Sequence, residues 1–544
     1  MGRLRSALPG MGLRYGIVLL IAVSLHGQAP AGWAARPPLG SDRPQGFWFG
    51  GGLWSADRHG PAAPFIESLG LGNGTTGNGV DAEAGWKGRR WEAALRITGY
   101  RDASGQDHAL VPRGHLTYRS LGGWTTSLER EPLVWGFGLN GGYLLGEASR
   151  PVPKIRIATP MAPLSAWGVP LGAWKGQVFL GQVDAATTLP EDTQSPSLKI
   201  RSIASQGTPV RPFLSGIRAE AAFGDSIEFY LNWISLFGGT LNGRQIDSGY
   251  KFSDYLTAFL GAKDARIEGG TDLVTGGPSQ YRPLDVISAS NSDVGMRIRF
   301  QALESLFRAR DVRFYVSRGS KGVHISYGPL FKKPLYYIGK DMDADWRAVA
   351  TFAPGSIWGR SYRYTAPSPI VPNDTVGVMV DWGVWKVGLE YLDTVNVRDF
   401  SGGTAPGVDP LYGHRSFTHA FYQVGFYDQG DPLGSALGGE ARYGTFHVQW
   451  DPSRAWRFLG WLESGDRPFR DDLGDWLLDH PGKHPVRNRF TQVQLVVEHH
   501  GRDGFLARSG ASAQRQSAVL NEYGRGGTGF RWFLELGWTW GLGG

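Results

Sequence analysis

Hydrophobic and polar residues alternate with a period of two in segments spread along the whole 544-residue chain. In FRWFLELGWTW, residues 530–540, every even-numbered position is large and apolar, whereas the odd-numbered positions include Arg531 and Glu535. The same pattern occurs in five other segments: 226–237, 295–301, 312–319, 385–393 and 491–499. Successive side chains of a β-strand point to opposite faces, so this alternation predicts strands with one apolar and one polar face.

Two kinds of connection separate these segments. WKGRRW (Trp86–Trp91) and SLGGWTT (Ser120–Thr126) have the length and composition of hairpin turns. By contrast, 401–415 and 465–487 are long, polar and rich in Gly and Pro. Short turns that alternate with long loops predict a barrel with one tight end and one elaborate end.

The residues on the two faces favour a membrane barrel over a secreted all-β protein, which is the alternative for an alternating pattern. Tryptophan and tyrosine crowd the ends of the apolar faces, as in the aromatic girdles of membrane barrels, and the opposite faces carry charges that suit a watery lumen. After residue 25 the chain has no apolar stretch of the roughly 18 residues that a membrane helix needs. We therefore expect an all-β, antiparallel transmembrane barrel of 16–20 strands over residues 35–544, with short periplasmic turns and long extracellular loops.

The N-terminus has the order of a secretory signal peptide. Arg3, Arg5 and Arg14 precede the apolar run 16–25, and small residues follow it. We expect a signal peptide over 1–34, with cleavage after Ala31 or Ala34.

Composition narrows the possible functions. The chain has 80 glycines, 21 tryptophans and no cysteine, so its stability must come from backbone pairing and packing rather than disulfides. The net charge of +7 is modest and is spread along the chain, and we expect no nucleic-acid partner.

Several motifs match chemical sites only in part. Gly72, Gly74 and Gly77 match a dinucleotide fingerprint but precede a strand-like pattern instead of a helix. Asp341, Asp343 and Asp345 lack the other residues of a calcium loop, and adjacent His499 and His500 must point to opposite faces of a strand. Exposed acidic residues at 466, 471, 472 and 475 remain an alternative ion site. With no catalytic signature elsewhere, we expect no enzymatic activity, no metal and no cofactor.

The polar strand faces contain a candidate ligand surface. Guanidinium groups pair with carboxylates, and aromatic rings stack on sugars, so these side chains suit an acidic polysaccharide in the lumen. The alternative is that the charges pair with Glu228 and Glu390 and keep the lumen wet. The candidate residues are Tyr230, Arg297, Arg299, Arg313, Tyr315 and Lys386.

The C-terminal segment has an expected position and two expected partners. Its even-numbered face should meet lipid, with Trp538 and Trp540 in the membrane girdle, while Arg531 and Glu535 face the lumen. As the closing strand it should pair with residues near 46–54 and so remove the edges of the sheet. Such a strand also serves the outer-membrane insertion machinery as a recognition signal. The Gly-Leu-Gly-Gly overhang after Trp540 has no explanation in the sequence.

The stretch LEREPLVWGFGLNGGYLLGEASRPVPKIRI, residues 128–157, resembles the signature segment of the Wzi family of capsule assembly outer-membrane proteins. Weaker similarities follow in the same order at 213–239, 292–300 and 414–450. Phe137 stands where the family usually has proline, and no helical bundle precedes the first strand-like segment. The signature positions are Trp135, Gly136, Gly138, Pro151 and Pro153.

The resemblance implies an outer-membrane barrel of 18 strands that attaches or organises capsular or exported polysaccharide at the surface of a Gram-negative cell. A porin-like diffusion channel or exopolysaccharide export barrel is the alternative, because both need a polar lumen. An outer-membrane hydrolase is a third hypothesis, and it requires a Ser or Asp beside a His at the extracellular rim.

Overall fold

The computed structural model describes residues 45–59, 76–102, 104–139, 144–146, 151–166, 169–183, 211–241, 244–245, 247–248, 250–259, 288–321, 323–324, 337–338, 374–393, 427–428, 431–432, 442–468, 487–501, 504–517 and 527–543. The expected signal peptide, 1–34, and both of its cleavage sites lie outside these ranges.

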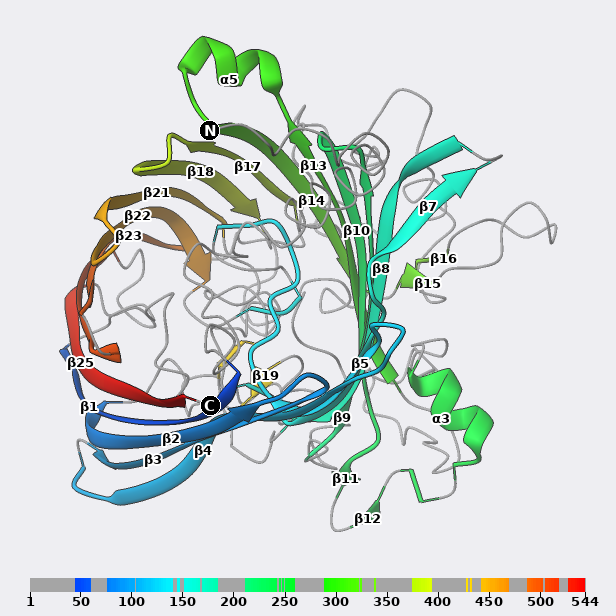
Figure 1. The fold of residues 1–544 in the computed structure, drawn as a ribbon, viewed down its shortest axis with the longest axis horizontal. Helices are drawn as coiled ribbons and strands as arrows, with labels where there is room; N and C mark the ends of the chain where they lie inside the picture. Colours follow the sequence, from blue (N-terminus) through cyan, green and yellow to red (C-terminus); the bar gives the residue numbers. More distant parts are fainter. Residues whose placement is uncertain are drawn as a thin grey trace, which may run out of the picture.

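The strands form one closed antiparallel barrel of 18 positions (Figure 1). Consecutive barrel strands pair with each other except for β6 and β7, which both pair with β8 and so share one position. The 18 strands that the family resemblance implied are confirmed. The barrel strands are β1 (Gly46–His59), β2 (Gly77–Lys87), β3 (Trp91–Asp102), β4 (Asp107–Arg119), β5 (Thr125–Arg130), β6 (Lys154–Ala158), β7 (Ala162–Ala166), β8 (Val169–Gln182), β9 (Phe213–Phe223), β10 (Ile227–Phe237), β13 (Ser288–Arg299), β14 (Asp311–Lys321), β17 (Asp374–Asp381), β18 (Trp385–Asp393), β21 (Arg442–Ser453), β22 (Trp456–Pro468), β23 (Arg487–His500), β24 (Leu506–Ser517) and β25 (Gly527–Gly543).

Among the described residues, two helices and three small sheets lie outside the barrel sheet. The helices are α3 (Phe252–Phe259) and α5 (Gln301–Phe307). The small sheets are β11 (Thr240–Leu241) with β12 (Arg244–Gln245), β15 (Val323–His324) with β16 (Tyr337–Ile338), and β19 (Tyr427–Asp428) with β20 (Asp431–Pro432). Among the described helices, none has the length and apolar character required to cross a membrane.

The two ends of the barrel differ as the sequence predicted. At one end, which we call the tight end, most neighbouring strands are joined by a few residues, as at 88–90 and 120–124. Most connections at the other end are long, as between β14 and β17 or β18 and β21. Helix α5 joins β13 to β14 at the tight end, whereas α3 follows β10 at the long-loop end, and Figure 1 shows the two helices far apart.

The barrel closes through its first and last strands. β1 pairs with β25 from Gly46↔Gly543 to His59↔Phe530, which confirms the predicted partner. On β25 the even-numbered side chains from Phe530 to Trp540 are exposed or half-buried, whereas Arg531 and Glu535 are buried on the lumen side. The overhang also acquires an explanation, because Gly541–Gly543 continue the ladder opposite Gly46–Trp48.

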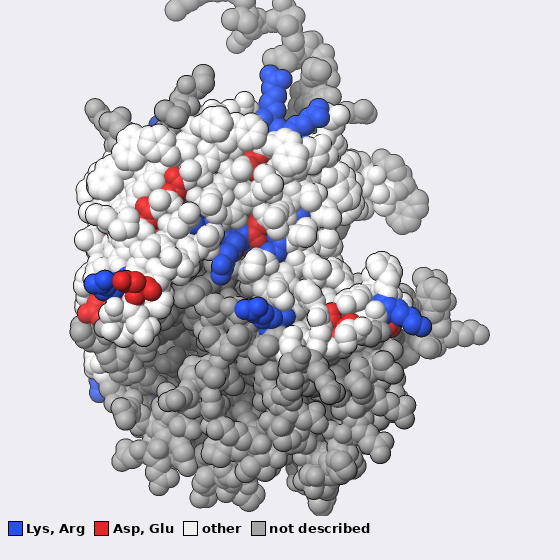
Figure 2. Space-filling view, turned by 90° about the horizontal axis from the view of Figure 1, so that it is seen from below, with Lys and Arg blue, Asp and Glu red and all other residues white. Residues whose placement is uncertain are grey.

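The outer surface of the barrel is apolar. Exposed large hydrophobic side chains occur on strands all around it, for example Leu53, Ile97, Leu389 and Leu495. Figure 2 shows one side of the molecule, on which most described residues are uncharged and the charged groups are scattered. An apolar exterior around a closed sheet is the arrangement that a bilayer requires.

Exposed aromatic side chains gather at the tight end. One run of rings in contact crosses β18 and β21–β25, in the order Trp385, Trp450, Phe458, Trp456, His499, Phe505 and Trp538. Across the closure, Trp540 stacks on Phe49 with ring centroids 5.4 Å apart. The geometry is that of an interfacial girdle, and the membrane role of Trp538 and Trp540 stays a prediction.

Glycines on the lumen wall make room for aromatic rings. A Cβ atom at Gly79 would overlap the ring of Trp54, and one at Gly377 would overlap the ring of Tyr315. The same relation joins Gly85 to Trp48, Gly216 to Phe179, Gly295 to Tyr230 and Gly510 to Phe533. This pairing gives part of the chain's many glycines and aromatic residues a shared structural role.

Candidate functional site

The chain between β5 and β6 folds into the barrel instead of continuing along its rim. We call residues 131–153 the inward segment, of which 131–139, 144–146 and 151–153 are described. Trp135, Leu139 and Leu144 are among its fully buried side chains, and the Trp135 N–H donates to the Leu145 carbonyl at 3.0 Å. In Figure 1 the cyan trace of this part of the chain passes inside the ring of strands.

The inward segment reaches the far wall of the lumen. The Leu139 N–H donates to Glu390 Oε2 of β18 at 2.6 Å, and the Tyr315 hydroxyl of β14 donates to the same oxygen at 2.7 Å. β18 lies nearly opposite β5 and β6 in the strand order. The segment is therefore fixed across the lumen rather than along one wall.

Aromatic contacts hold the inward segment between these two points. Phe137 packs edge-on against Tyr230 of β10 with centroids 4.7 Å apart, and the Arg297 guanidinium lies 4.4 Å from the Phe137 ring centre. Trp135 packs edge-on against Phe179 of β8 at 5.2 Å. These contacts bury one side of the segment against β8, β10 and β13.

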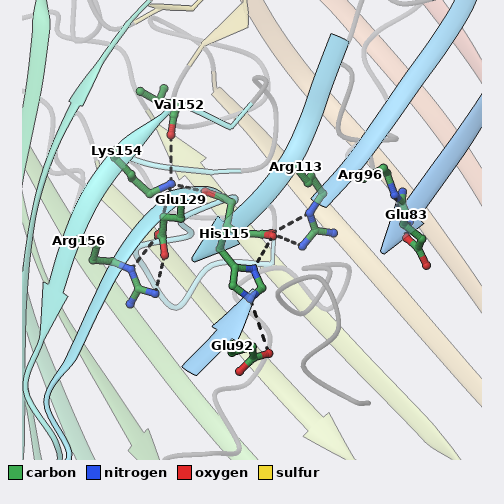
Figure 3. A network of polar contacts seen from close by, with 10 residues as sticks. Glu83, Glu92, Arg96, Arg113, His115, Glu129, Val152, Lys154 and Arg156 are labelled. Atoms are coloured by element: carbon green, nitrogen blue, oxygen red, sulfur yellow. Dashed lines mark hydrogen bonds and ion pairs between the residues drawn. The ribbon is translucent and has the colours of Figure 1, made fainter. Parts of the chain in front are cut away.

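Lys154 and Arg130 hold the two ends of the inward segment together, and Figure 3 shows the Lys154 contacts. The Lys154 ammonium, which is buried, donates to the carbonyls of Glu131 and Val152, the latter at 3.3 Å. Arg130 Nε donates to the Pro151 carbonyl at 3.0 Å. The segment thus leaves and re-enters the wall at a closed neck.

The wall beneath this neck, on β2–β6, carries a chain of ion pairs (Figure 3). Glu131 contacts Arg113 at 2.6 Å and His115 at 3.2 Å, while Arg156 reaches Glu129 at 2.8 Å. Further along, Arg96 lies 2.8 Å from Glu83. Each of these cations has its carboxylate partner within the protein.

The predicted arginines lie together on β13 and β14 and are also paired. Arg297 is buried and binds Glu228, which also contacts Arg313 at 3.3 Å. Arg299 lies 2.5 Å from Glu304 of α5, at the tight end. Their proposed role toward a polysaccharide stays a prediction.

The predicted tyrosines and lysine are more separated. Tyr230 and Tyr315 are buried under the inward segment, with their hydroxyl groups bonded to Asp293 at 3.0 Å and to Glu390 at 2.7 Å. Lys386 lies on β18, 3.9 Å from Asp381 near the tight end. The tyrosines therefore support the inward segment in this structure.

The family-signature residues all belong to the inward segment. Gly136 has a φ of 151°, a backbone conformation that favours glycine. Gly138 lies between the buried Phe137 and Leu139. Pro151 supplies the carbonyl that Arg130 binds, and Pro153 precedes β6. The sequence singled out this segment by resemblance alone, and the structure gives it a physical role.

Gln492 and Gln494 of β23 were not among the site residues predicted from the sequence. Alternation placed Gln492 and Gln494 on the polar face of β23, but nothing distinguished them from other polar residues. In the structure both are buried, and their amide groups have no hydrogen-bond partner among the described residues. Glu390, which joins the inward segment to β18, was considered only as a partner for lumen cations.

The partial motifs do not assemble into a site in the part of the chain that the structure describes. His499 packs on Trp456 with centroids 4.3 Å apart, while exposed His500 lies 3.8 Å from Glu498. Gly77 begins β2, a strand instead of a helix. Asp341, Asp343 and Asp345, and the side chains at 466, 471, 472 and 475, lie outside the described residues.

Comparison by sequence finds no matching family model and no matching curated protein. Comparison by structure finds Wzi of Escherichia coli, described as an outer membrane protein involved in group 1 capsule assembly and as a carbohydrate-binding β-barrel. The match has a TM-score of 0.52 at 16% identity and covers 95% of this chain and 87% of that one. OpdQ of Pseudomonas aeruginosa matches at a TM-score of 0.41 and 7% identity.

The structural match confirms the resemblance to Wzi at the level of the fold. The closed 18-strand barrel and its apolar exterior are those of a Gram-negative outer-membrane protein. At 16% identity the likeness does not carry a ligand from one chain to the other.

Proposed function

We propose that this barrel binds a surface polysaccharide and attaches or organises it at the outer membrane without catalysing a reaction. The observation that carries the proposal is the inward segment, which crosses the lumen and is bonded at Leu139 to Glu390 of the far wall. A diffusion channel requires a continuous water-filled path, and a segment fixed across the lumen opposes such a path.

Two further observations support a binding role. The Wzi barrel that this fold resembles is described as carbohydrate-binding. The buried side chains of the barrel wall also include both charged and amide groups. Sugar hydroxyl groups donate and accept hydrogen bonds, so a polar lumen wall suits them.

A gene deletion tests the attachment role. Loss of the barrel should leave the total polysaccharide unchanged but move most of it from the cell surface to the growth medium, as measured by fractionation and carbohydrate assay. Abolished synthesis would contradict the proposal. The control is a strain complemented with the wild-type gene.

Planar-bilayer conductance separates the proposed function from the channel alternative. We expect the wild-type barrel to show little steady conductance, and Glu390→Ala to show more because Leu139 and Tyr315 lose their shared acceptor. Glu390→Gln is the matched control, since it keeps one oxygen that accepts hydrogen bonds. A large, stable open pore in the wild-type protein would favour a diffusion or export channel instead.

A further inference from the structure

The lumen wall of β21–β24 differs from the charged walls in its chemistry. We call its inward-facing residues the amide wall, and they form two rows across four strands. One row is Thr445, Glu463, Gln492 and Gln514; the other is His447, Trp461, Gln494 and Ser512. All eight side chains are buried.

Two neighbouring side chains of the amide wall lack partners. The Nε2 and Oε1 atoms of Gln492 and of Gln494 are shielded from solvent and form no hydrogen bond within the described chain. A buried amide without partners costs free energy, and native proteins nearly always satisfy such groups. The described chain supplies no partner for these four atoms, so a water molecule or a bound ligand has to provide one.

The ion-paired walls provide the contrast. On β2–β6 and on β10, β13 and β14, arginines and carboxylates of the chain bind one another. A ligand that bound these walls would have to displace the ion pairs. A ligand that bound Gln492 and Gln494 would displace no hydrogen-bond partner within the described chain.

Charge and geometry indicate the kind of partner. Glu463 is the only Asp, Glu, Lys or Arg residue among the eight, and the Thr445 hydroxyl donates to it at 3.3 Å. The eight residues therefore include no lysine or arginine; the neighbouring cation is Arg531 of β25, opposite Ser512 at the end of the second row. Gln492 and Gln494 lie two positions apart, about 7 Å along the strand, so their amides form a repeated pair of donors and acceptors.

The flanks limit the length of the polar surface. Tyr443 and Phe490 lie beyond it toward the long-loop end, with ring centroids 6.4 Å apart. Leu459, Val496 and Phe533 form an apolar cluster toward the tight end. The amide wall is thus a short polar band between two apolar surfaces.

We propose that the amide wall binds the hydroxyl groups of an uncharged stretch of carbohydrate through Gln492 and Gln494. The inference rests on the proposed function and adds to it the site and the class of sugar. Each amide donates from Nε2 and accepts at Oε1, which matches hydroxyl groups that both accept and donate.

Calorimetric titration of the full barrel in detergent tests the proposal. The probes are maltoheptaose, which is neutral, and an oligogalacturonate of similar length, which is acidic. The variant Gln492→Met with Gln494→Met removes the amides while keeping their size. Thr491→Ala with Val493→Ala, two exposed positions on the same strand, is the matched control.

We expect the wild type and the control to bind maltoheptaose and the methionine variant to bind it at least about tenfold more weakly, because several hydrogen bonds are lost. The methionine variant should remain folded, as judged by heat-modifiable electrophoretic mobility. Apolar groups that replace unpaired amides leave stability nearly unchanged.

Equal binding of maltoheptaose by the wild type and the methionine variant would overturn the proposal. So would binding of the oligogalacturonate alone, although that result would leave the proposed polysaccharide-binding function intact. Binding of neither probe would overturn the inference as well. The deletion experiment above then decides separately whether the barrel retains polymer at the cell surface.

Discussion

At the scale of single residues, glycine and aromatic side chains act as pairs on the lumen wall. Gly377 of β17 leaves the space that the Tyr315 ring occupies, and Tyr315 in turn donates to Glu390 beside Leu139. The position of the inward segment therefore depends on a missing side chain on β17, through the Tyr315 ring.

Gly377→Ala should destabilise the barrel by about 1–3 kcal/mol, because the new methyl group overlaps the Tyr315 ring and forces it to move. Urea unfolding of the barrel in detergent, followed by tryptophan fluorescence, measures the change. Gly99→Ala is the control, since a Cβ atom there meets nothing within 4 Å. Equal stability of the two variants would refute the space-filling explanation.

At the scale of elements, α5 is tied to the barrel by an ion pair. Glu304 accepts hydrogen bonds from Arg299 of β13 at 2.5 and 3.1 Å. Hydrogen bonding from Arg299 is the main reason that the pKa of Glu304 is lowered, although burial acts in the opposite direction. The carboxylate therefore stabilises the folded state when it is ionised.

Glu304→Gln should lower the free energy of unfolding by about 1 kcal/mol at neutral pH, because a charge-assisted pair becomes a neutral one. Since the folded-state pKa is depressed, the contribution is present above the unfolded pKa of about 4.3 and disappears as the pH falls through the folded value. Wild type and variant should thus converge in urea unfolding at low pH. A difference that persists unchanged into strong acid would contradict this account.

At the scale of the whole molecule, the aromatic run at the tight end marks one level around the barrel. The ring centroids of Trp538 and Phe505 lie 5.3 Å apart, and those of Trp540 and Phe49, across the closure, lie 5.4 Å apart. Both tryptophans are exposed on the outer surface. The closing strand therefore contributes to the barrel seam and to the proposed girdle at once.

Replacing both tryptophans with alanine should cost about 2 kcal/mol of stability in lipid vesicles, since each loses an aromatic pair worth about 1 kcal/mol. Replacement of both by phenylalanine keeps a ring at each position and should restore most of the loss. Urea unfolding from vesicles measures both variants. If the alanine and phenylalanine variants unfold alike, the ring contacts do not contribute.

The sequence predicted the fold better than the site, and the reason is physical. The alternation in 530–540 was sufficient to orient β25 and to identify β1 as its partner, because strand geometry fixes which side chains share a face. The role of Glu390 depends instead on Leu139, which is distant in the sequence. No local pattern indicates such a contact. The unpaired amides of Gln492 and Gln494 likewise depend on what the rest of the lumen wall leaves unbonded.

The pairing of β1 with β25 also determines when this protein completes its sheet. These strands stand at opposite ends of the described chain, so β1 lacks one neighbour until β25 has been synthesised and has joined the sheet. A chain that lacks β25 has two open sheet edges, at β1 and β24, which are templates for aggregation. Folding to the closed state thus carries the entropic cost of joining strands that are distant in the sequence, and the presence of β25 is the condition for leaving the aggregation-prone state.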